Sequence, residues 1–206
     1  FEPAFFGGAG AVSEYVGHPL LDELERHPPD ERLVAEVRSR PTLVVMPGSR
    51  SQELELHLWP MVRAARALRA GRPDLRVVLP HRDEGRVERL RELLAEHDPD
   101  GLVELEVGDP APWLRGARAV LAKSGTGALE ACLHGTPTVI VYVVPGLTGR
   151  WFARNMLTVP WFGLPNLSVD RLVVPEVAIE QDRQWEEATD HVARFLEDSP
   201  ERQGCV

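Results

Sequence analysis

The chain has 206 residues, of which 43% are hydrophobic and 27% are charged, as in an ordinary globular domain. Its net charge of −9 argues against a nucleic-acid-binding protein, because such proteins are usually basic. The apolar runs are too short to cross a bilayer, and two cysteines, Cys132 and Cys205, make a disulfide framework implausible, so we expect a cytoplasmic protein.

Short apolar strands alternate with amphipathic helices between residues 41 and 142. The predicted strands are Thr42–Met46, Leu75–Leu79, Leu102–Val107, Ala119–Ala122 and Thr138–Tyr142. The predicted helices are Gln52–Ala70, Glu84–Glu96 and Thr126–His134. This alternation with short connections predicts the α/β class, with a Rossmann-like parallel sheet covered by helices on both faces.

The C-terminal part has a different composition, rich in Pro, Gly, Trp and Phe between residues 145 and 175. A short helix near Thr148–Leu157 is predicted there, and a polar helix follows at Gln184–Leu196. We expect a linker segment at residues 1–20, a Rossmann-like domain at 21–182, and a C-terminal helix and tail at 183–206. The opening Phe1-Glu2-Pro3 resembles neither a signal peptide nor a natural start, so we expect a piece of a longer protein.

The first loop of unusual composition, Pro47-Gly48-Ser49-Arg50, follows the first strand. Parallel sheets bind ligands at the carboxyl ends of their strands. Gly48 allows a ligand to approach the backbone, and Ser49 with Gln52 can form a capping box at a helix N-terminus that favours anions. Arg50 can add a guanidinium that binds phosphate oxygens. The same residues also fit an ordinary capped turn with a surface arginine.

The second loop, Ser124-Gly125-Thr126, follows the strand at Ala119–Ala122 and also opens a helix. Glu130 lies about one turn inside that helix, where its carboxylate can accept hydrogen bonds from two ribose hydroxyls. An acidic residue there also simply suits the helix dipole. Each loop alone is weak evidence, but two such loops on one sheet, together with Glu130, predict binding of a nucleoside diphosphate.

Several motifs occur in a fixed order along the chain. They are Phe1-Glu2, Gly17-His18-Pro19, Pro47-Gly48-Ser49-Arg50 with Glu53, Ser124-Gly125-Thr126 with Leu129-Glu130, Leu164-Pro165-Asn166-Leu167, and Val174-Pro175-Glu176 with Gln181. This series resembles that of the lipid-A-disaccharide synthase family, from residue 1 to about residue 182. The resemblance implies a GT-B glycosyltransferase, in which two Rossmann-like domains face each other, and it makes this chain the donor-binding half.

The resemblance also implies an activity and a set of substrate-binding residues. The activity is inverting transfer of 2,3-diacylglucosamine from its UDP derivative to 2,3-diacylglucosamine 1-phosphate, forming the β-1,6-linked lipid A disaccharide 1-phosphate and UDP. The residues are Gly48, Ser49, Arg50, Glu53, Ser124, Gly125, Thr126, Glu130, Tyr142, Asn166 and Gln181. The two loops would hold the diphosphate, Glu130 the ribose, and Tyr142 would lie beside the uracil. Asn166 and Gln181 would lie toward the sugar and phosphate.

Inverting transfer requires a base for the acceptor hydroxyl and charge stabilisation for the departing UDP. The helix N-termini and Arg50 can supply the charge stabilisation for UDP without a metal or other cofactor. No side chain of this chain is a convincing base, so we expect the base on the N-terminal acceptor domain and no transferase activity from this chain alone. Lys123 departs from the family, because it replaces the small residue usual before the Ser-Gly-Thr run.

Other interpretations compete with parts of this prediction. Asp98-Pro99-Asp100 has the form of a metal-binding Asp-x-Asp pair, but we interpret it as a solvated turn. The aromatic and basic stretch Gly146–Leu157, with Trp161 and Phe162, either fills the core or contacts acyl chains or the inner face of a membrane. The alternative functions are a UDP-sugar 2-epimerase and a non-catalytic nucleotide-binding module.

Overall fold

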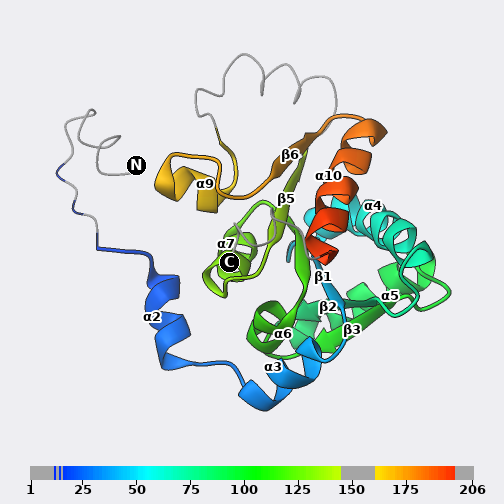
Figure 1. The fold of residues 1–206 in the computed structure, drawn as a ribbon, viewed down its shortest axis with the longest axis horizontal. Helices are drawn as coiled ribbons and strands as arrows, with labels where there is room; N and C mark the ends of the chain where they lie inside the picture. Colours follow the sequence, from blue (N-terminus) through cyan, green and yellow to red (C-terminus); the bar gives the residue numbers. More distant parts are fainter. Residues whose placement is uncertain (1–11, 13, 15, 145–160, 198–206) are drawn as a thin grey trace.

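The computed structural model describes residues 12, 14, 16–144 and 161–197. In this part of the chain, six parallel strands form one sheet in the order β3-β2-β1-β4-β5-β6 (Figure 1). The strands are β1 (Thr42–Met46), β2 (Arg76–His81), β3 (Val103–Val107), β4 (Ala119–Lys123), β5 (Thr138–Val143) and β6 (Glu176–Ile179). The predicted α/β class with a parallel sheet is confirmed.

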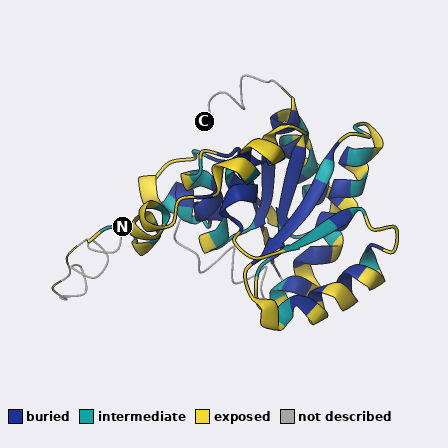
Figure 2. Ribbon diagram, turned by 90° about the horizontal axis from the view of Figure 1, so that it is seen from below, coloured by how far each residue is buried: buried dark blue, intermediate teal, exposed yellow. Residues whose placement is uncertain are grey.

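Helices cover both faces of this sheet, so the strands are buried between two helical layers (Figures 1 and 2). One layer consists of α4 (Ser51–Ala70), α5 (Val87–His97) and α10 (Asp182–Leu196). The other consists of α3 (Glu31–Arg38), α6 (Ala111–Gly116), α7 (Thr126–Leu133) and α9 (Leu164–Val169). The remaining helices are α2 (Pro19–Arg26), which has no buried residue, and the 3-10 turn η1 (Glu84–Arg86).

The central strand β1 illustrates why the sequence forms this sheet. Leu43 and Val45 pack into the core on the α4 side, and Val44 between them packs into the core on the α7 side. Because both faces of the strand are covered, its sequence is continuously apolar and does not alternate with polar residues. The same reasoning applies to β2, β4 and β5, whereas the edge strand β3 alternates apolar residues with Glu104 and Glu106.

The structure adds elements that the apolar pattern did not predict, namely α2, α3, α6, α9 and β6. Strand β6 has four residues, and only Val177 and Ile179 among them are buried, which is too short a pattern to detect. Helix α10, predicted as a polar C-terminal segment, packs Trp185 and Phe195 into the same core as the sheet. The helix predicted near Thr148–Leu157 lies outside the described residues.

Asp98 corrects one prediction from sequence. The Asp98–Asp100 segment was interpreted as a solvated turn, but the Asp98 side chain is buried. Its carboxylate accepts hydrogen bonds from Arg66 Nη2 at 2.9 Å and from the Val103 N–H at 2.7 Å. Burial is possible because these donors compensate the charge. Across the described ranges, no helix is both long and apolar enough to span a membrane.

Candidate functional site

The two predicted loops meet in one cavity at the carboxyl ends of β1 and β4. The strand order reverses between these strands, because the chain runs outward from β1 to β3 and then returns to continue from β4 to β6. Such a reversal is the usual ligand-binding position of an open parallel sheet. The cavity has a volume of about 570 Å³. The predicted residues that line it are Gly48, Ser49, Arg50, Glu53, Ser124, Gly125, Thr126 and Glu130.

The first loop binds a carboxylate of its own chain. Glu53, in the first turn of α4, turns back so that its Oε2 accepts the N–H groups of Ser49 at 3.2 Å and Arg50 at 3.4 Å. A Cβ on Gly48 would lie 2.5 Å from this Oε2, and the φ of Gly48 is +111°, so both features require glycine. The predicted capping box of Ser49 and Gln52 is wrong, because Arg50 is the N-cap residue and Glu53 supplies the returning acid.

Lys123, at the end of β4 and just before the second loop, forms an ion pair with Glu53, which binds the first loop. Its Nζ donates to Glu53 Oε1 at 2.9 Å, and Arg50 Nη1 lies 3.3 Å from the same oxygen. Burial acts to raise the pKa of Glu53, but Lys123 and the N–H groups of Arg50 and Ser49 outweigh it and hold the pKa below its ordinary value. The first loop and β4 are therefore connected through one ionised carboxylate.

The second loop has a helix N-terminus without a side-chain cap among the described residues. Gly125 is the N-cap residue of α7, and its position supplies no side chain that could accept from the first-turn N–H groups. Ser124 is engaged elsewhere, since its Oγ donates to the Phe162 carbonyl at 2.8 Å. The N-terminus of α7 thus faces the cavity as a site suited to an anion.

Glu130 is buried and faces an arginine that the sequence prediction did not include. Arg82 Nη2 lies 3.0 Å from Glu130 Oε1, and it also lies 3.4 Å from Asp109 Oδ1. Burial raises the pKa of Glu130, and the charge and hydrogen bond of Arg82 oppose this rise. Arg82 directly follows β2, next to β1, so its place at the carboxyl edge of the sheet was the signal that could have identified it.

His81, the last residue of β2, also lines the cavity and was not predicted. Its side chain is buried, and no described residue is a hydrogen-bond partner of its Nε2. Burial lowers the pKa of His81, which favours the neutral imidazole.

The model of a known family matches nearly the whole chain. The family is described as lipid-A-disaccharide synthetase, and the match covers residues 1–204. The chain belongs to this family. A lipid-A-disaccharide synthase from Chromohalobacter salexigens is 35% identical over 208 residues, which cover 98% of this chain and 53% of the relative. One from Burkholderia vietnamiensis is 40% identical over 181 residues, which cover 86% of this chain and 46% of the relative. The chain spans about half the length of the curated relatives it matches.

Solved structures of GT-B glycosyltransferases share the fold of this lipid-A-disaccharide synthetase family member. A spinosyn rhamnosyltransferase, also solved with thymidine diphosphate, aligns with a TM-score of 0.52 at 19% identity, over 81% of this chain and 40% of its own. An α,α-trehalose 6-phosphate synthase from Burkholderia multivorans aligns with a TM-score of 0.51 at 13% identity, over 89% and 41%. At sequence identities this low, the similarity is evidence of a shared fold alone.

Three residues that the family resemblance assigns to the substrate do not line the cavity: Tyr142, Asn166 and Gln181. Tyr142 is the second-last residue of β5 and has 39% of its surface exposed. Its ring centroid lies 5.9 Å from that of Phe162, which does line the cavity. Gln181 is exposed just before α10, and its N–H donates to Gln184 Oε1 at 2.9 Å. Their roles toward the substrate stay predictions.

Asn166 is fully buried and is hydrogen-bonded within the protein. Its Nδ2 donates to the Val174 carbonyl and to Glu176 Oε2, both at 2.9 Å. Its Oδ1 accepts the N–H groups of Val173 at 2.8 Å and Val174 at 3.0 Å. These four bonds use the full capacity of an asparagine amide. In this family member the side chain therefore connects α9 to the segment that leads into β6.

Glu176 extends this connection to the cavity. Its carboxylate accepts the N–H groups of Phe162 at 3.0 Å and Gly163 at 2.9 Å, in addition to Asn166. Phe162 in turn lines the cavity and accepts the hydrogen bond of Ser124. The Leu164–Leu167 and Val174–Glu176 motifs thus fix one wall of the cavity through their mutual contacts.

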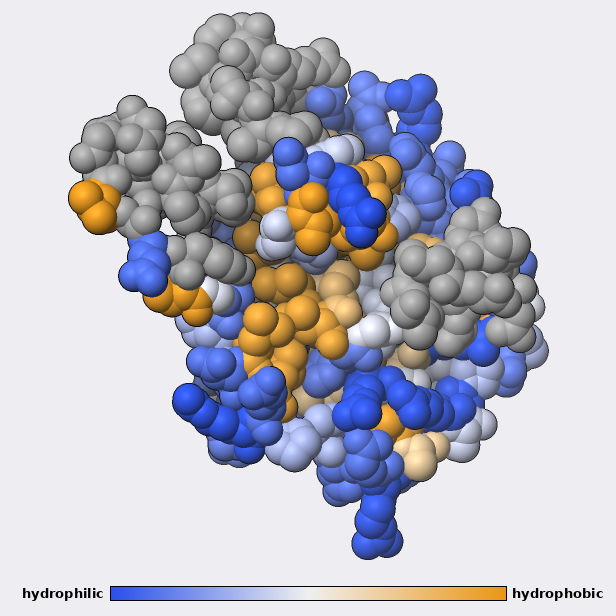
Figure 3. All heavy atoms as spheres, turned by 60° about the vertical axis from the view of Figure 1, so that its left-hand side comes forward, coloured by the Kyte–Doolittle hydropathy of each residue, from blue (hydrophilic) through white to orange (hydrophobic). Residues whose placement is uncertain are grey.

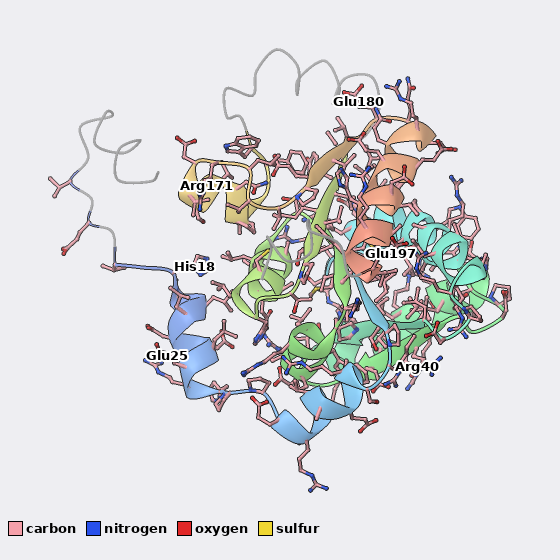
Figure 4. All side chains as sticks on the ribbon, viewed as in Figure 1. His18, Glu25, Arg40, Arg171, Glu180 and Glu197 are labelled. Carbon is pink, nitrogen blue, oxygen red and sulfur yellow. The ribbon has the colours of Figure 1, made fainter. Side chains whose placement is uncertain are left out.

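The Gly17-His18-Pro19 motif lies away from the cavity, at the start of α2 (Figure 4). The Nδ1 of His18 accepts the Leu20 N–H at 3.2 Å and so caps this helix. The side of the molecule that carries α2 and α9 also presents apolar side chains (Figure 3). Exposed apolar residues on or next to α2, α7 and α9 are Leu21, Leu133, Val169 and Leu172.

Proposed function

We propose that this chain is the donor-binding half of a lipid-A-disaccharide synthase. The enzyme transfers 2,3-diacylglucosamine from its UDP derivative to 2,3-diacylglucosamine 1-phosphate, and it releases UDP and the β-1,6-linked disaccharide 1-phosphate. The observation that carries the proposal is the cavity between β1 and β4, where the α7 N-terminus, Lys123 and Arg50 surround one space. Membership of the family and its curated synthases support this reaction.

The charges of the cavity suit the leaving group. A helix N-terminus and two cations can stabilise the negative charge that develops on UDP as the sugar departs. Glu130 lies about one turn inside α7. Its Oε1 contacts Arg82, and its Oε2 can accept a hydrogen bond from a ribose hydroxyl. These side chains do this without a metal ion.

The proposed partners follow from the reaction and from the length of the relatives. The acceptor and the base that deprotonates its hydroxyl belong on an N-terminal acceptor domain of the same protein, facing this cavity. Because both substrates carry acyl chains, we propose that the enzyme binds them at a membrane surface, the cytoplasmic face of the inner membrane. The apolar side chains near α2 and α9 suit acyl groups. Trp151 and Phe152, also proposed for membrane contact, lie outside the described residues.

The alternative of a UDP-sugar 2-epimerase requires acidic and histidine side chains that converge on the sugar. His81 and Glu130 do line one cavity, which is the one observation in its favour. Family membership favours the transferase, because the curated relatives carry that name. Incubation of the complete enzyme with its UDP-sugar alone distinguishes the two, since an epimerase needs no acceptor for turnover.

Calorimetric titration of the 206-residue chain with UDP tests the proposal. We expect the wild type to bind UDP and Arg50→Ala to weaken binding by about 1.5–3 kcal/mol, the range for a hydrogen bond to a charged group. Arg91→Ala is the matched control, because Arg91 is an exposed arginine on α5 paired only locally with Glu88. Equal affinities of wild type and Arg50→Ala would remove Arg50 from the site. Failure of the wild type to bind UDP would refute the proposed function.

A further inference from the structure

The basic residues of this chain are almost all arginine. Of 23 lysine and arginine residues, 22 are arginine, and Lys123 is the single lysine. It lies at the end of β4, at the strand-order reversal where the cavity opens. A chain that otherwise uses arginine has its single lysine in the lining of its candidate site.

The Lys123 ammonium lies between the two loops. Nζ is 2.9 Å from Glu53 Oε1 on the first loop's helix, and a Cβ built on Gly125 in the second loop would lie 3.8 Å from Nζ. The side chain is 18% exposed, whereas that of Arg50 is 81% exposed. A charge in such a partly desolvated crevice interacts more strongly with a ligand than an exposed charge does, because water screens it less.

The ammonium group also has N–H donors that can bind a ligand. A lysine has three N–H donors, and Glu53 accepts one of them. Glu53 in turn takes the N–H groups of Ser49 and Arg50, which removes the backbone donors that the first loop was expected to offer a diphosphate. A ligand at this position therefore meets Lys123 and the α7 N-terminus, rather than the backbone of the first loop.

We propose that Lys123 binds the diphosphate of the donor nucleotide, and that Glu53 orients its ammonium toward the α7 N-terminus. This inference rests on the proposed function and assigns to Lys123, at the end of β4, a direct contact with the substrate. Lysine suits this role because its ammonium is a compact point charge with three N–H donors.

The single lysine makes a direct test possible without mutation. The 206-residue chain, labelled with lysine that carries ¹³C at Cε, gives one lysine signal in its NMR spectrum. We expect UDP and inorganic pyrophosphate to shift this signal, and uridine to leave it in place. Glu53→Gln is expected to shift the signal of the free chain, because the ion pair is lost, and to reduce the response to UDP, because the ammonium is no longer oriented.

Calorimetry on the same samples separates the possible failures. Lys123→Met is expected to weaken UDP binding about tenfold, or about 1.4 kcal/mol, while Arg91→Met leaves it unchanged. Suppose that UDP binds by calorimetry, does not shift the lysine signal, and binds wild type and Lys123→Met with equal affinity. This inference is then overturned and the proposed function stands. If the wild type binds neither UDP nor pyrophosphate, both are overturned.

Discussion

Replacement of Asn166 by alanine distinguishes a structural role of this side chain from contact with the sugar. Of its four hydrogen bonds, the two to the N–H and the carbonyl of Val174 are fully buried. Each buried group left without a partner costs about 1–3 kcal/mol. The bonds to Val173 and Glu176 are partly buried and add less. From the two buried groups alone we expect Asn166→Ala to lower the free energy of unfolding by about 4 kcal/mol.

Urea denaturation followed by circular dichroism measures this loss, with Gln181→Ala as the control. Gln181 has the same predicted role toward the substrate but is exposed at the N-cap of α10, so its replacement is expected to cost about 1 kcal/mol, the typical loss of a capping side chain. If Asn166→Ala unfolded at nearly the wild-type urea concentration, the four bonds would not stabilise the fold. If that variant also lost UDP-sugar affinity, Asn166 would be a substrate ligand, as the family resemblance implies.

Two further predictions concern the ionised groups of the cavity. Glu53→Gln is expected to lower the free energy of unfolding by about 1.5 kcal/mol at pH 7. Because the folded pKa of Glu53 lies below its unfolded value, its contribution is complete above the unfolded pKa and is lost as pH falls through the folded pKa. The difference from wild type in urea denaturation should therefore shrink at pH 3, and equal differences at both pH values would contradict the ion pair with Lys123. Arg82→Met is expected to raise the pKa of Glu130 further, since burial already raises it and Arg82 opposes the rise. As pH decreases, UDP affinity of this variant should then begin to fall at a higher pH than that of wild type, and identical calorimetric pH profiles would contradict a role of Glu130 in binding.

Most of the sheet could be predicted from sequence because β1, β2, β4 and β5 are buried on both faces and contain continuous apolar runs, separated by helical patterns. The edge strand β3 was predicted from a shorter pattern, in which apolar residues alternate with Glu104 and Glu106. Strand β6 has two buried residues among its four, and helices α6 and α9 have fewer than two turns each, so their patterns are too short to detect. Elements of this length depend on contacts with distant segments, which a local pattern does not contain.

The position of the site could be predicted, but its internal partners could not. Both loops follow apolar strands and open helices, so their convergence at one edge of the sheet follows from the fold. The carboxylate that occupies the first loop is different, because only the structure brings Glu53 within reach of Lys123, 70 residues later in the chain. Arg82 beside Glu130 depends in the same way on β2 lying next to β1.

The reversal of strand order has a consequence for how the domain holds together. Strands β1 to β3 and strands β4 to β6 form two halves of the sheet, and each half contributes one wall of the cavity. A nucleotide in that cavity contacts both halves at once and resists their separation. A ligand at one hundred times its dissociation constant adds about 2.7 kcal/mol to the stability of the state that binds it. Under the proposed function, occupancy of the cavity by a nucleotide therefore acts as a reversible cross-link across the middle of the sheet.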